Sequence, residues 1–434
     1  DIGRLPTRAD LDDITPNNPV AFEEMGHALW VNSKMLELAG IESDAADPHG
    51  AKFERDGASG RLTGLLHEAD HLVFPHIPEV PGEIRKRNIV NAINQLNREG
   101  VTSVTEPGAE LPLLALYEEL AEEDALSARV SVHLKAGRSL QAAKEALAAY
   151  SGDVRQRGLE KPLLNVRGIK LYMDGAPPGK TALMFEDYAC CPGEKGILLY
   201  DGETQQEQVE EINRSMDWLH RQGYQMAVHT DGDHSANIAI EGLILAMGNT
   251  PTAAKNNPLR HYLIHGDLVT DDDITRMAQW RIGLTTQPVI TNSAGHVVSK
   301  LWGPERGNRH MAPGLFVNAG VWTSLSTDAP IVPPDWKQNI EFAVLRKNET
   351  SPPGMARPEY RVSVKEAIIA YTRTPAYQEF QEDIKGTIEA GKLADLAVID
   401  KNPLDIDPRD ISELKTLMTV LGGDIVYENL ADAQ

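Results

Sequence analysis

Short apolar runs alternate with longer amphipathic stretches through most of the chain. From about residue 80, seven runs rich in Val, Ile and Leu are separated by segments with apolar residues at helical spacing. The runs are GVTSVTEPG (100–108), ARVSVHL (128–134), RGIKLYMDG (167–175), YQMAVHTDGD (224–233), RHYLIHGD (260–267), RIGLTTQP (281–288) and GVWTSLSTDAP (320–330). Alternating strands and helices predict a parallel α/β sheet. Seven such strands favour a (β/α)8 TIM-like barrel with one strand missing.

The two flanks have different patterns. Near the start, TRADLDDI predicts a short helix with Thr7 as its cap, HALWVNSKMLELAGI (27–41) predicts a helix that stops at Gly40, and SGRLTGLLHE (59–68) predicts a turn or hairpin. Near the end, GTIEAGKLADLAVIDKNPL and TLMTVLGGDIVYEN predict short strands. We therefore expect a lid or insertion segment of the barrel domain (1–75), the barrel itself (76–384) and a small C-terminal β domain (385–434).

Composition and charge narrow the class of protein. The 434 residues include 41% hydrophobic and 24% charged positions, as in ordinary globular proteins. No apolar run approaches the ~20 residues that span a bilayer, so we expect a soluble chain without a membrane partner. A formal net charge of −22 argues against a general basic surface for nucleic acid. The adjacent Cys190 and Cys191 imply no disulfide framework.

Four residues with ligand chemistry close different apolar runs. They are Lys170, His229, His265 and Asp328. The carboxyl ends of barrel strands open onto one face, so these residues would converge there. Imidazole and carboxylate groups bind zinc, which polarises a carbonyl and activates water. Each residue alone has an ordinary structural explanation, such as a turn Asp or a surface Lys. Together, in barrel order, they predict a divalent metal site.

Motifs throughout the chain resemble the amidohydrolase superfamily. The resemblance is specific to its YtcJ-like (amidohydrolase 3) subfamily, which includes N-substituted formamide deformylases. The motifs are PTRADLDDITPNNPV, GHALWVNS, SGRLTGLLHE, GVTSVTEPG, IKLYMDG, AVHTDGD, RHYLIH, QP, STDAP, AYTRTPAY and GTIEAGKLADLAVID. The last motif is similar to the stretch that leaves the barrel and enters a composite β-sandwich, so the resemblance implies that C-terminal fold.

The resemblance implies a role for each of the four residues. His229 and His265 would bind one or two divalent ions, with zinc favoured. Lys170 would be carboxylated by carbon dioxide and bridge the metals. Asp328 would bind metal and move the proton of the attacking water, so that it is also the predicted catalytic residue.

Four other residues are predicted to face the substrate. The motifs GHALWVNS and RHYLIH would place His27 and His261 near it. His261 and Gln287 are candidates for contacting the substrate oxygen. Arg306 lies in the loops around the last two strands and is expected to line the pocket.

The chain departs from the family pattern at two places. The family carries a His-x-His pair on its first barrel strand, and no such pair occurs in these residues. We therefore expect that an N-terminal segment with this strand is missing. A cytoplasmic location is favoured, but an upstream signal peptide stays open. The second departure is LIHGD, where the subfamily more often has Glu-His-Ala-Gln, and this puts the substrate class in doubt.

These observations favour a hydrolase that cleaves the C–N bond of a small amide or formamide with metal-activated water. Two alternatives stay open at this point. One is a deaminase or cyclic-amide hydrolase on the same scaffold, because a fold does not determine its substrate. The other is a non-catalytic scaffold protein, although such a protein has no reason to keep all four ligand residues. The resemblance also favours a homodimer.

Overall fold

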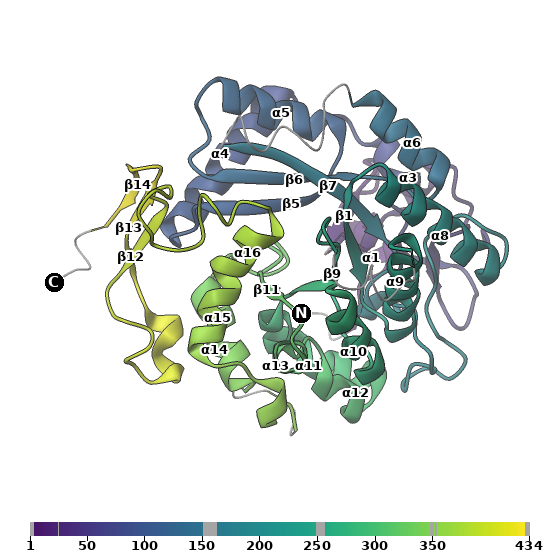
Figure 1. Cartoon of the computed structure of the whole chain (residues 1–434). Helices are drawn as coiled ribbons and strands as arrows, with labels where there is room; N and C mark the ends of the chain where they lie inside the picture. Colours follow the sequence, from purple (N-terminus) through teal and green to yellow (C-terminus); the bar gives the residue numbers. More distant parts are fainter. Residues whose placement is uncertain are drawn as a thin grey trace.

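A parallel sheet forms the centre of the molecule. The computed structural model describes residues 4–24, 26–150, 163–248, 257–347, 351 and 354–429. The seven predicted strands pair in the order β11-β10-β9-β8-β7-β6-β5, so each lies beside its neighbours in the chain. They are β5 (Ser103–Ala109), β6 (Arg129–Lys135), β7 (Leu164–Tyr172), β8 (Gln225–Thr230), β9 (Tyr262–His265), β10 (Gly283–Thr286) and β11 (Thr323–Leu325). The sheet curls into a half-barrel (Figure 1), which confirms the predicted α/β barrel class.

Helices connect successive strands and cover the outer face of the sheet (Figure 1). They are α4 (Gly82–Arg98), α5 (Leu111–Glu122), α6 (Leu140–Ala149), α8 (Gln205–Arg221), α9 (Asp233–Ala246), α10 (Asp271–Trp280), α11 (Pro288–Trp302), α12 (Pro304–Arg309) and α13 (Pro313–Ala319). Between the second and third apolar runs, helix α6 extends as far as Ala149, and residues 151–162 lie outside the described residues.

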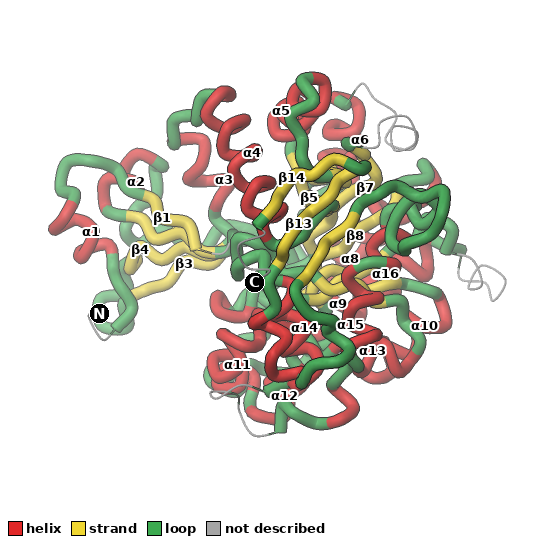
Figure 2. The backbone as a smooth tube through the Cα atoms, turned by 90° about the vertical axis from the view of Figure 1, so that its left-hand side faces the viewer, coloured by secondary structure: helices red, strands yellow, loops and turns green. Residues whose placement is uncertain are grey.

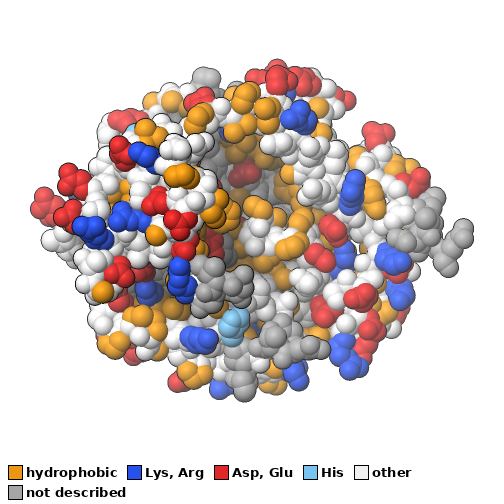
Figure 3. Space-filling model, turned by 180° about the vertical axis from the view of Figure 1, so that it is seen from behind, with side chains coloured by type: hydrophobic (Ala, Val, Ile, Leu, Met, Phe, Trp, Pro, Cys, Tyr) orange, Lys and Arg blue, Asp and Glu red, His pale blue; other side chains and the backbone are white. Residues whose placement is uncertain are grey.

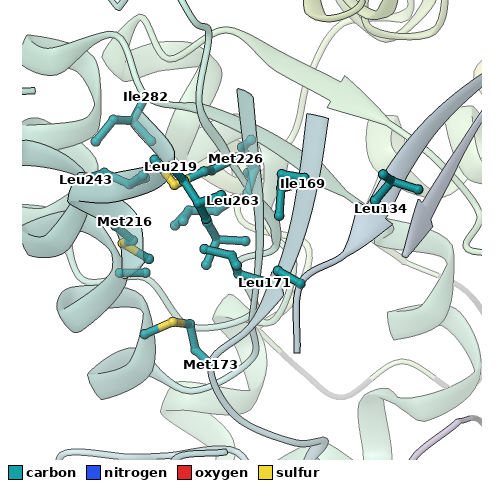
Figure 4. Close-up of a cluster of buried hydrophobic side chains, with 14 of the residues drawn as sticks. Leu134, Ile169, Leu171, Met173, Met216, Leu219, Met226, Leu243, Leu263 and Ile282 are labelled. Atoms are coloured by element: carbon teal, nitrogen blue, oxygen red, sulfur yellow. The ribbon is translucent and has the colours of Figure 1, made fainter. Parts of the chain in front are cut away.

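The main core fills the space between this sheet and its helices. Figure 4 shows side chains from β7, β8 and β9 meeting those of α8 and α9. Leu171, Leu219, Met226 and Leu263 are completely buried there. Burying a side chain of this size contributes roughly 1.5–3 kcal/mol, so this layer fixes the strand ends firmly relative to one another.

The N-terminal segment forms a second, antiparallel sheet. Its strands are β1 (Ala21–Glu24), β2 (Ala28–Val31), β3 (Lys52–Arg55) and β4 (Leu62–His67), in the order β1-β2-β4-β3. The helices around it are α1 (Arg8–Ile14), α2 (Ser33–Leu38), α3 (Asp70–Val73) and the 3-10 helix η1 (Phe74–His76). Thr7 is the N-cap residue of α1, and its backbone N–H donates to the carboxylate of Asp10 at 2.7 Å. The predicted hairpin is confirmed as β3–β4. Figure 2 shows this sheet projecting beside the half-barrel.

The helix predicted over HALWVNSKMLELAGI is wrong in its first part. Residues Ala28–Val31 form β2, and only Ser33–Leu38 are helical. The strand is stabilised by pairing on both sides, with β1 and with β4. A partner more than 30 positions away thus overrides the helical spacing of the local apolar residues.

The C-terminal part adds three helices and a third sheet. The helices are α14 (Trp336–Leu345), α15 (Val364–Tyr371) and α16 (Arg373–Gln378), with 3-10 turns η3 (Pro358–Tyr360) and η4 (Pro408–Glu413). Strands β12 (Leu396–Ile399), β13 (Thr416–Leu421) and β14 (Asp424–Glu428) form an antiparallel sheet, which confirms the predicted β structure there. Within the described ranges, none of the helices has the length and apolar character that crossing a bilayer requires.

Candidate metal centre

Three of the predicted ligands lie at the carboxyl ends of neighbouring strands. Lys170 is the third-last residue of β7, His229 the second-last of β8 and His265 the last of β9. Because these strands pair in parallel, their ends lie side by side. The ring centroids of His229 and His265 are 4.6 Å apart. Asp328 follows β11, in a half-buried position.

An aspartate that the sequence analysis overlooked joins the two histidines. Ligand atoms of His229, Asp231 and His265 all lie within 4.8 Å of one another. Nε2 of His229 is 3.8 Å from Oδ1 of Asp231, and both atoms are buried without a hydrogen-bond partner in the described part of the chain. Leaving such atoms unpaired costs free energy. Two imidazoles and a carboxylate are a donor set that fits zinc or a similar divalent cation.

The position of Asp231 has a simple signal in the sequence. It stands two residues after His229, and side chains two apart along an extended chain point to the same side. Our prediction considered only the residues that closed the apolar runs, so it stopped at His229. The same rule applied one step further identifies Asp231.

Negative charge accumulates around these ligands. Burial and the carboxylates of Asp267, Asp174 and Asp328 raise the pKa of Asp231 well above its usual range. Burial lowers the pKa of Lys170 to about 8, although nearby carboxylates act in the opposite direction. A bound cation would relieve the repulsion among the carboxylates. One face of the molecule is hollowed near its middle, and acidic side chains are visible inside the hollow (Figure 3).

The two histidines are prepared as neutral ligands. Burial, followed by the charges of His265, His27 and Lys170, lowers the pKa of His229 well below its usual value. Burial also lowers the pKa of His265. Neutral imidazole is the form that coordinates metal, so both rings are in the required state near neutral pH.

Gln287 orients one of the rings. Its Oε1 lies 2.9 Å from Nδ1 of His265, and its Nε2 donates to Oγ of Ser326 at 2.8 Å. This contact makes Nδ1 the donor and turns the lone pair of Nε2 of His265 toward the centre. Both polar atoms of the buried Gln287 are thus engaged. Gln287 is therefore better placed to orient His265 than to make the predicted contact with the substrate oxygen.

Asp174 holds the loop that carries Asp231. Its carboxylate accepts backbone N–H bonds from Leu183 at 2.8 Å, Asp231 at 3.1 Å and Gly232 at 2.9 Å. The hydroxyl of Ser235 also donates to it, at 2.6 Å. Since Asp174 is completely buried at the end of β7, it ties the loops after β7 and β8 together and limits how far Asp231 can move.

Two of the predicted ligands have unusual backbone geometry. The φ angle is +73° at His265 and +59° at Asp328. Residues other than glycine rarely adopt this left-handed region, and each instance costs of order 1–3 kcal/mol. Such angles concentrate at functional sites, where the surrounding structure enforces the direction of a side chain.

The N-terminal segment brings a histidine and a glutamate to the centre. His27 lies between β1 and β2, and its ring centroid is 5.2 Å from that of His229. Nδ1 of His27 is 3.1 Å from Oε1 of Glu68, which directly follows β4. Burial lowers the pKa of His27, but Glu68, Asp174 and Asp328 outweigh it, so that the net shift is upward. The predicted proximity of His27 to the candidate site is thus seen in the structure.

The other two predicted substrate residues are placed differently. His261 directly precedes β9 and stands four residues before His265. It therefore lies near the amino end of this strand, roughly 13 Å from His265 along the chain. There its Nε2 bonds to His220 at 2.9 Å, and its Nδ1 accepts from the backbone N–H of Met226. This position contradicts the role predicted for His261. The motif RHYLIH covers a whole strand, and the motif alone does not say which of its two histidines stands at the carboxyl end.

Arg306 belongs to α12 and is engaged with the backbone. Its guanidinium donates to the carbonyl oxygens of Trp302 and Asp187, both at 2.8 Å. These contacts connect α11 and α12 with the loop after β7. They favour a structural role for Arg306 over the predicted contact with substrate.

Comparisons with known proteins agree with this geometry. The chain matches the amidohydrolase family over residues 1–427. It is 31% identical to the amidohydrolase YtcJ of Bacillus subtilis (strain 168), over 97% of this chain and 76% of that protein. It is 26% identical to the N-substituted formamide deformylase of Arthrobacter pascens, over 98% of this chain and 76% of that enzyme. A solved structure of a metal-dependent hydrolase from Pyrococcus furiosus is similar with a TM-score of 0.68 and 26% identity, covering 93% of this chain and 76% of the other. The match to the family, the curled parallel sheet and the cluster at its strand ends lead to one conclusion: the chain belongs to the amidohydrolase family.

Proposed function

We propose that the protein is a metal-dependent hydrolase that cleaves the C–N bond of a small amide or formamide. The observation that carries the proposal is the buried group of His229, Asp231 and His265, with two polar atoms that lack a partner among the described residues. The resemblance to a formamide deformylase and to a metal-dependent hydrolase supports the substrate class and the need for metal.

In this proposal His229, Asp231 and His265 hold a divalent ion, with Lys170 and Asp328 beside it. When bound, a zinc ion would supply a Lewis acid for the substrate carbonyl and would lower the pKa of water to about 7. Asp328 accepts the proton of the attacking water and returns it to the leaving nitrogen. Its position three residues after the end of β11 suits this role.

Carboxylation of Lys170 is a further part of the proposal. Its side chain is 97% buried among carboxylates, where an ammonium group lacks water. When the neutral amine bonds to the carbon of carbon dioxide and releases a proton, the residue becomes an anionic oxygen donor that would be suited to hold a metal ion. ¹³C NMR after incubation with labelled bicarbonate should then show a carbamate signal, absent in Lys170→Ala.

Metal analysis tests the centre directly. The wild-type protein, incubated with zinc and dialysed, should retain about one or two equivalents, and Asp231→Asn should retain less. Asp217→Asn, on the exposed side of α8, serves as the matched control and should retain the wild-type amount. A wild-type protein that binds no metal would refute the proposal.

Substrate screening tests the reaction. We expect amine release, followed with fluorescamine, from a panel of N-substituted formamides and N-acyl amides. Loss of that activity in Asp328→Asn at unchanged metal content would support the proton-transfer role. Release of ammonia from aminated rings, with no hydrolysis of the panel, would instead favour the deaminase alternative.

A further inference from the structure

Glu68 and His27 form a buried pair that the metal-ligand argument does not use. Both belong to the N-terminal segment, one after β4 and the other between β1 and β2. The backbone N–H of Glu68 also donates to the carbonyl of His27 at 3.0 Å, so the two residues are linked through backbone and side chain. Figure 2 shows the ends of this small sheet pointing at the half-barrel.

The carboxylate of Glu68 is enclosed by the loop after β7. Its Oε1 accepts from the hydroxyl of Thr181 at 3.1 Å and from Nδ1 of His27 at the same distance. A Cβ atom on Gly175 would lie only 2.0 Å from this oxygen, so only glycine there lets the carboxylate approach. Glu68 itself has φ of +54°, an uncommon angle for this residue. A side chain that is only 5% exposed and held in this way has one fixed position.

Two further contacts fix the N-terminal sheet against the same loop. Nζ of Lys180 donates to Glu54 at 3.1 Å, and Nζ of Lys52 donates to Glu194 at 2.7 Å. The ring of His67 packs against Gly179, where a Cβ atom would lie 2.7 Å from Nδ1. The sheet is therefore attached at several points, and attachment alone does not require the pair of Glu68 and His27.

The pair leaves one ring nitrogen of His27 available to a ligand beside the metal centre. The contact with Glu68 engages Nδ1 of His27, so Nε2, on the other side of the ring, is the nitrogen that can meet a ligand. The side chain of His27 is 22% exposed, unlike the fully enclosed rings of the metal centre, and it lies against His229.

We propose that His27 binds the amide group of the substrate through Nε2, and that Glu68 is the positioning residue that orients its ring. This inference rests on the proposed hydrolase function. It assigns the segment 1–75 a direct part in substrate binding. Replacing a carboxylate that orients a metal-ligating histidine typically changes metal affinity or activity by about 10–100-fold, and we expect an effect of this order for the orientation of His27.

The test compares Glu68→Gln with Glu54→Gln, which removes an attachment contact without touching His27. Using an amide that the wild type hydrolyses, we expect Glu68→Gln to lower kcat/KM about 10-fold or more with unchanged metal content. Glu54→Gln should keep the wild-type kcat/KM. If both variants lose activity in parallel with their melting temperatures, Glu68 only attaches the sheet and the proposal is wrong. An active Glu68→Gln variant would overturn it while leaving the hydrolase function intact.

A spectroscopic readout decides the question without turnover. In ¹⁵N-histidine-labelled, zinc-loaded protein, the His27 ring signals are identified by their loss in His27→Gln. Addition of N-methylformamide should shift them in the wild type, and less in Glu68→Gln. Signals of His27 that do not respond, while those of His229 do, would show that ligand binds at the centre without contacting His27. If no histidine signal responds and no amide is hydrolysed, both this proposal and the hydrolase function fail.

Discussion

A buried ion pair between the half-barrel and the C-terminal sheet allows a sharp test of what holds the two parts together. Arg129, the first residue of β6, binds Asp395, which precedes β12. The two bonds run from Nε to Oδ2 at 2.6 Å and from Nη2 to Oδ1 at 2.8 Å. The backbone N–H of Gly422 also donates to Asp395, at 2.8 Å. Both charged side chains are 5% exposed, so the perturbation we choose is Asp395→Leu.

The expected loss follows from the burial. Removing one partner of a buried ion pair typically costs about 3–5 kcal/mol, because the other charge stays buried without compensation. The unpaired N–H of Gly422 adds roughly 1 kcal/mol. Against a total stability of about 5–15 kcal/mol, this is a large fraction. For 434 residues the unfolding entropy is about 0.9 kcal/mol per kelvin, so the melting temperature should fall by roughly 4–6 °C.

The double variant Arg129→Met/Asp395→Leu separates the pair from its desolvation. Replacing both charges with apolar groups is often nearly neutral, so it should recover most of the loss, apart from the part due to Gly422. Chemical denaturation followed by circular dichroism measures both variants. Arg221→Met, in the exposed pair with Asp217, is the control and should stay within about 0.5 kcal/mol of the wild type. A double variant as unstable as the single one would refute the reasoning.

Three other predictions concern residues around the centre and the loops that support it. Gln287→Leu should weaken zinc binding about 10–100-fold by releasing the ring of His265, measured by calorimetry, and a wild-type affinity would contradict that role. Hydrogen bonds with His67 and Lys180 lower the pKa of Glu54 to about 2, below its value of about 4.5 in the unfolded chain. The stability that the ionised Glu54 contributes is therefore complete above about pH 4.5 and is lost as the pH falls toward 2. Glu54 is 31% exposed, so Glu54→Gln should cost only about 1 kcal/mol at pH 6 in denaturant titrations, and a gap that persists at pH 2 would contradict the assignment. The guanidinium of Arg346 is completely buried and donates to the carbonyls of Asn308, His310 and Met311 at the end of α12, so Arg346→Met should cost about 2–3 kcal/mol, and a loss smaller than about 0.5 kcal/mol would count against it.

The sequence predicted the central sheet well because its strands are buried on both faces. All six positions of β8 and all but the last of β6 are buried, which produces apolar runs that stand out from the amphipathic helices. The error at Ala28–Val31 has the opposite origin. That strand depends on pairing with β1 and β4, and a pairing between distant segments leaves no periodic signal in the local residues.

The candidate site shows the same division between local and distant information. His229 and His265 were predictable because each ends a strand, and parallel strands bring their ends together. His261 was misplaced because a motif does not say at which end of a strand it stands. Glu68 was not predicted at all, since its importance arises from Gly175, more than 100 positions later, where the missing side chain leaves room for a carboxylate.

Barrel strands and the loops that follow them fix the directions of side chains in different ways. A strand fixes the direction of a side chain through its period of two, and Asp231 continues this period from His229, one residue beyond the end of β8. Loops have no such period, and their side chains acquire a direction only from contacts. Asp174 provides these contacts for the loop after β8, and Glu68 provides them for His27. Variation in the contacts of Glu68 is therefore expected to change substrate binding before metal binding, because His229 and His265 belong to strands, whereas loss of the Asp174 contacts should affect metal binding through Asp231.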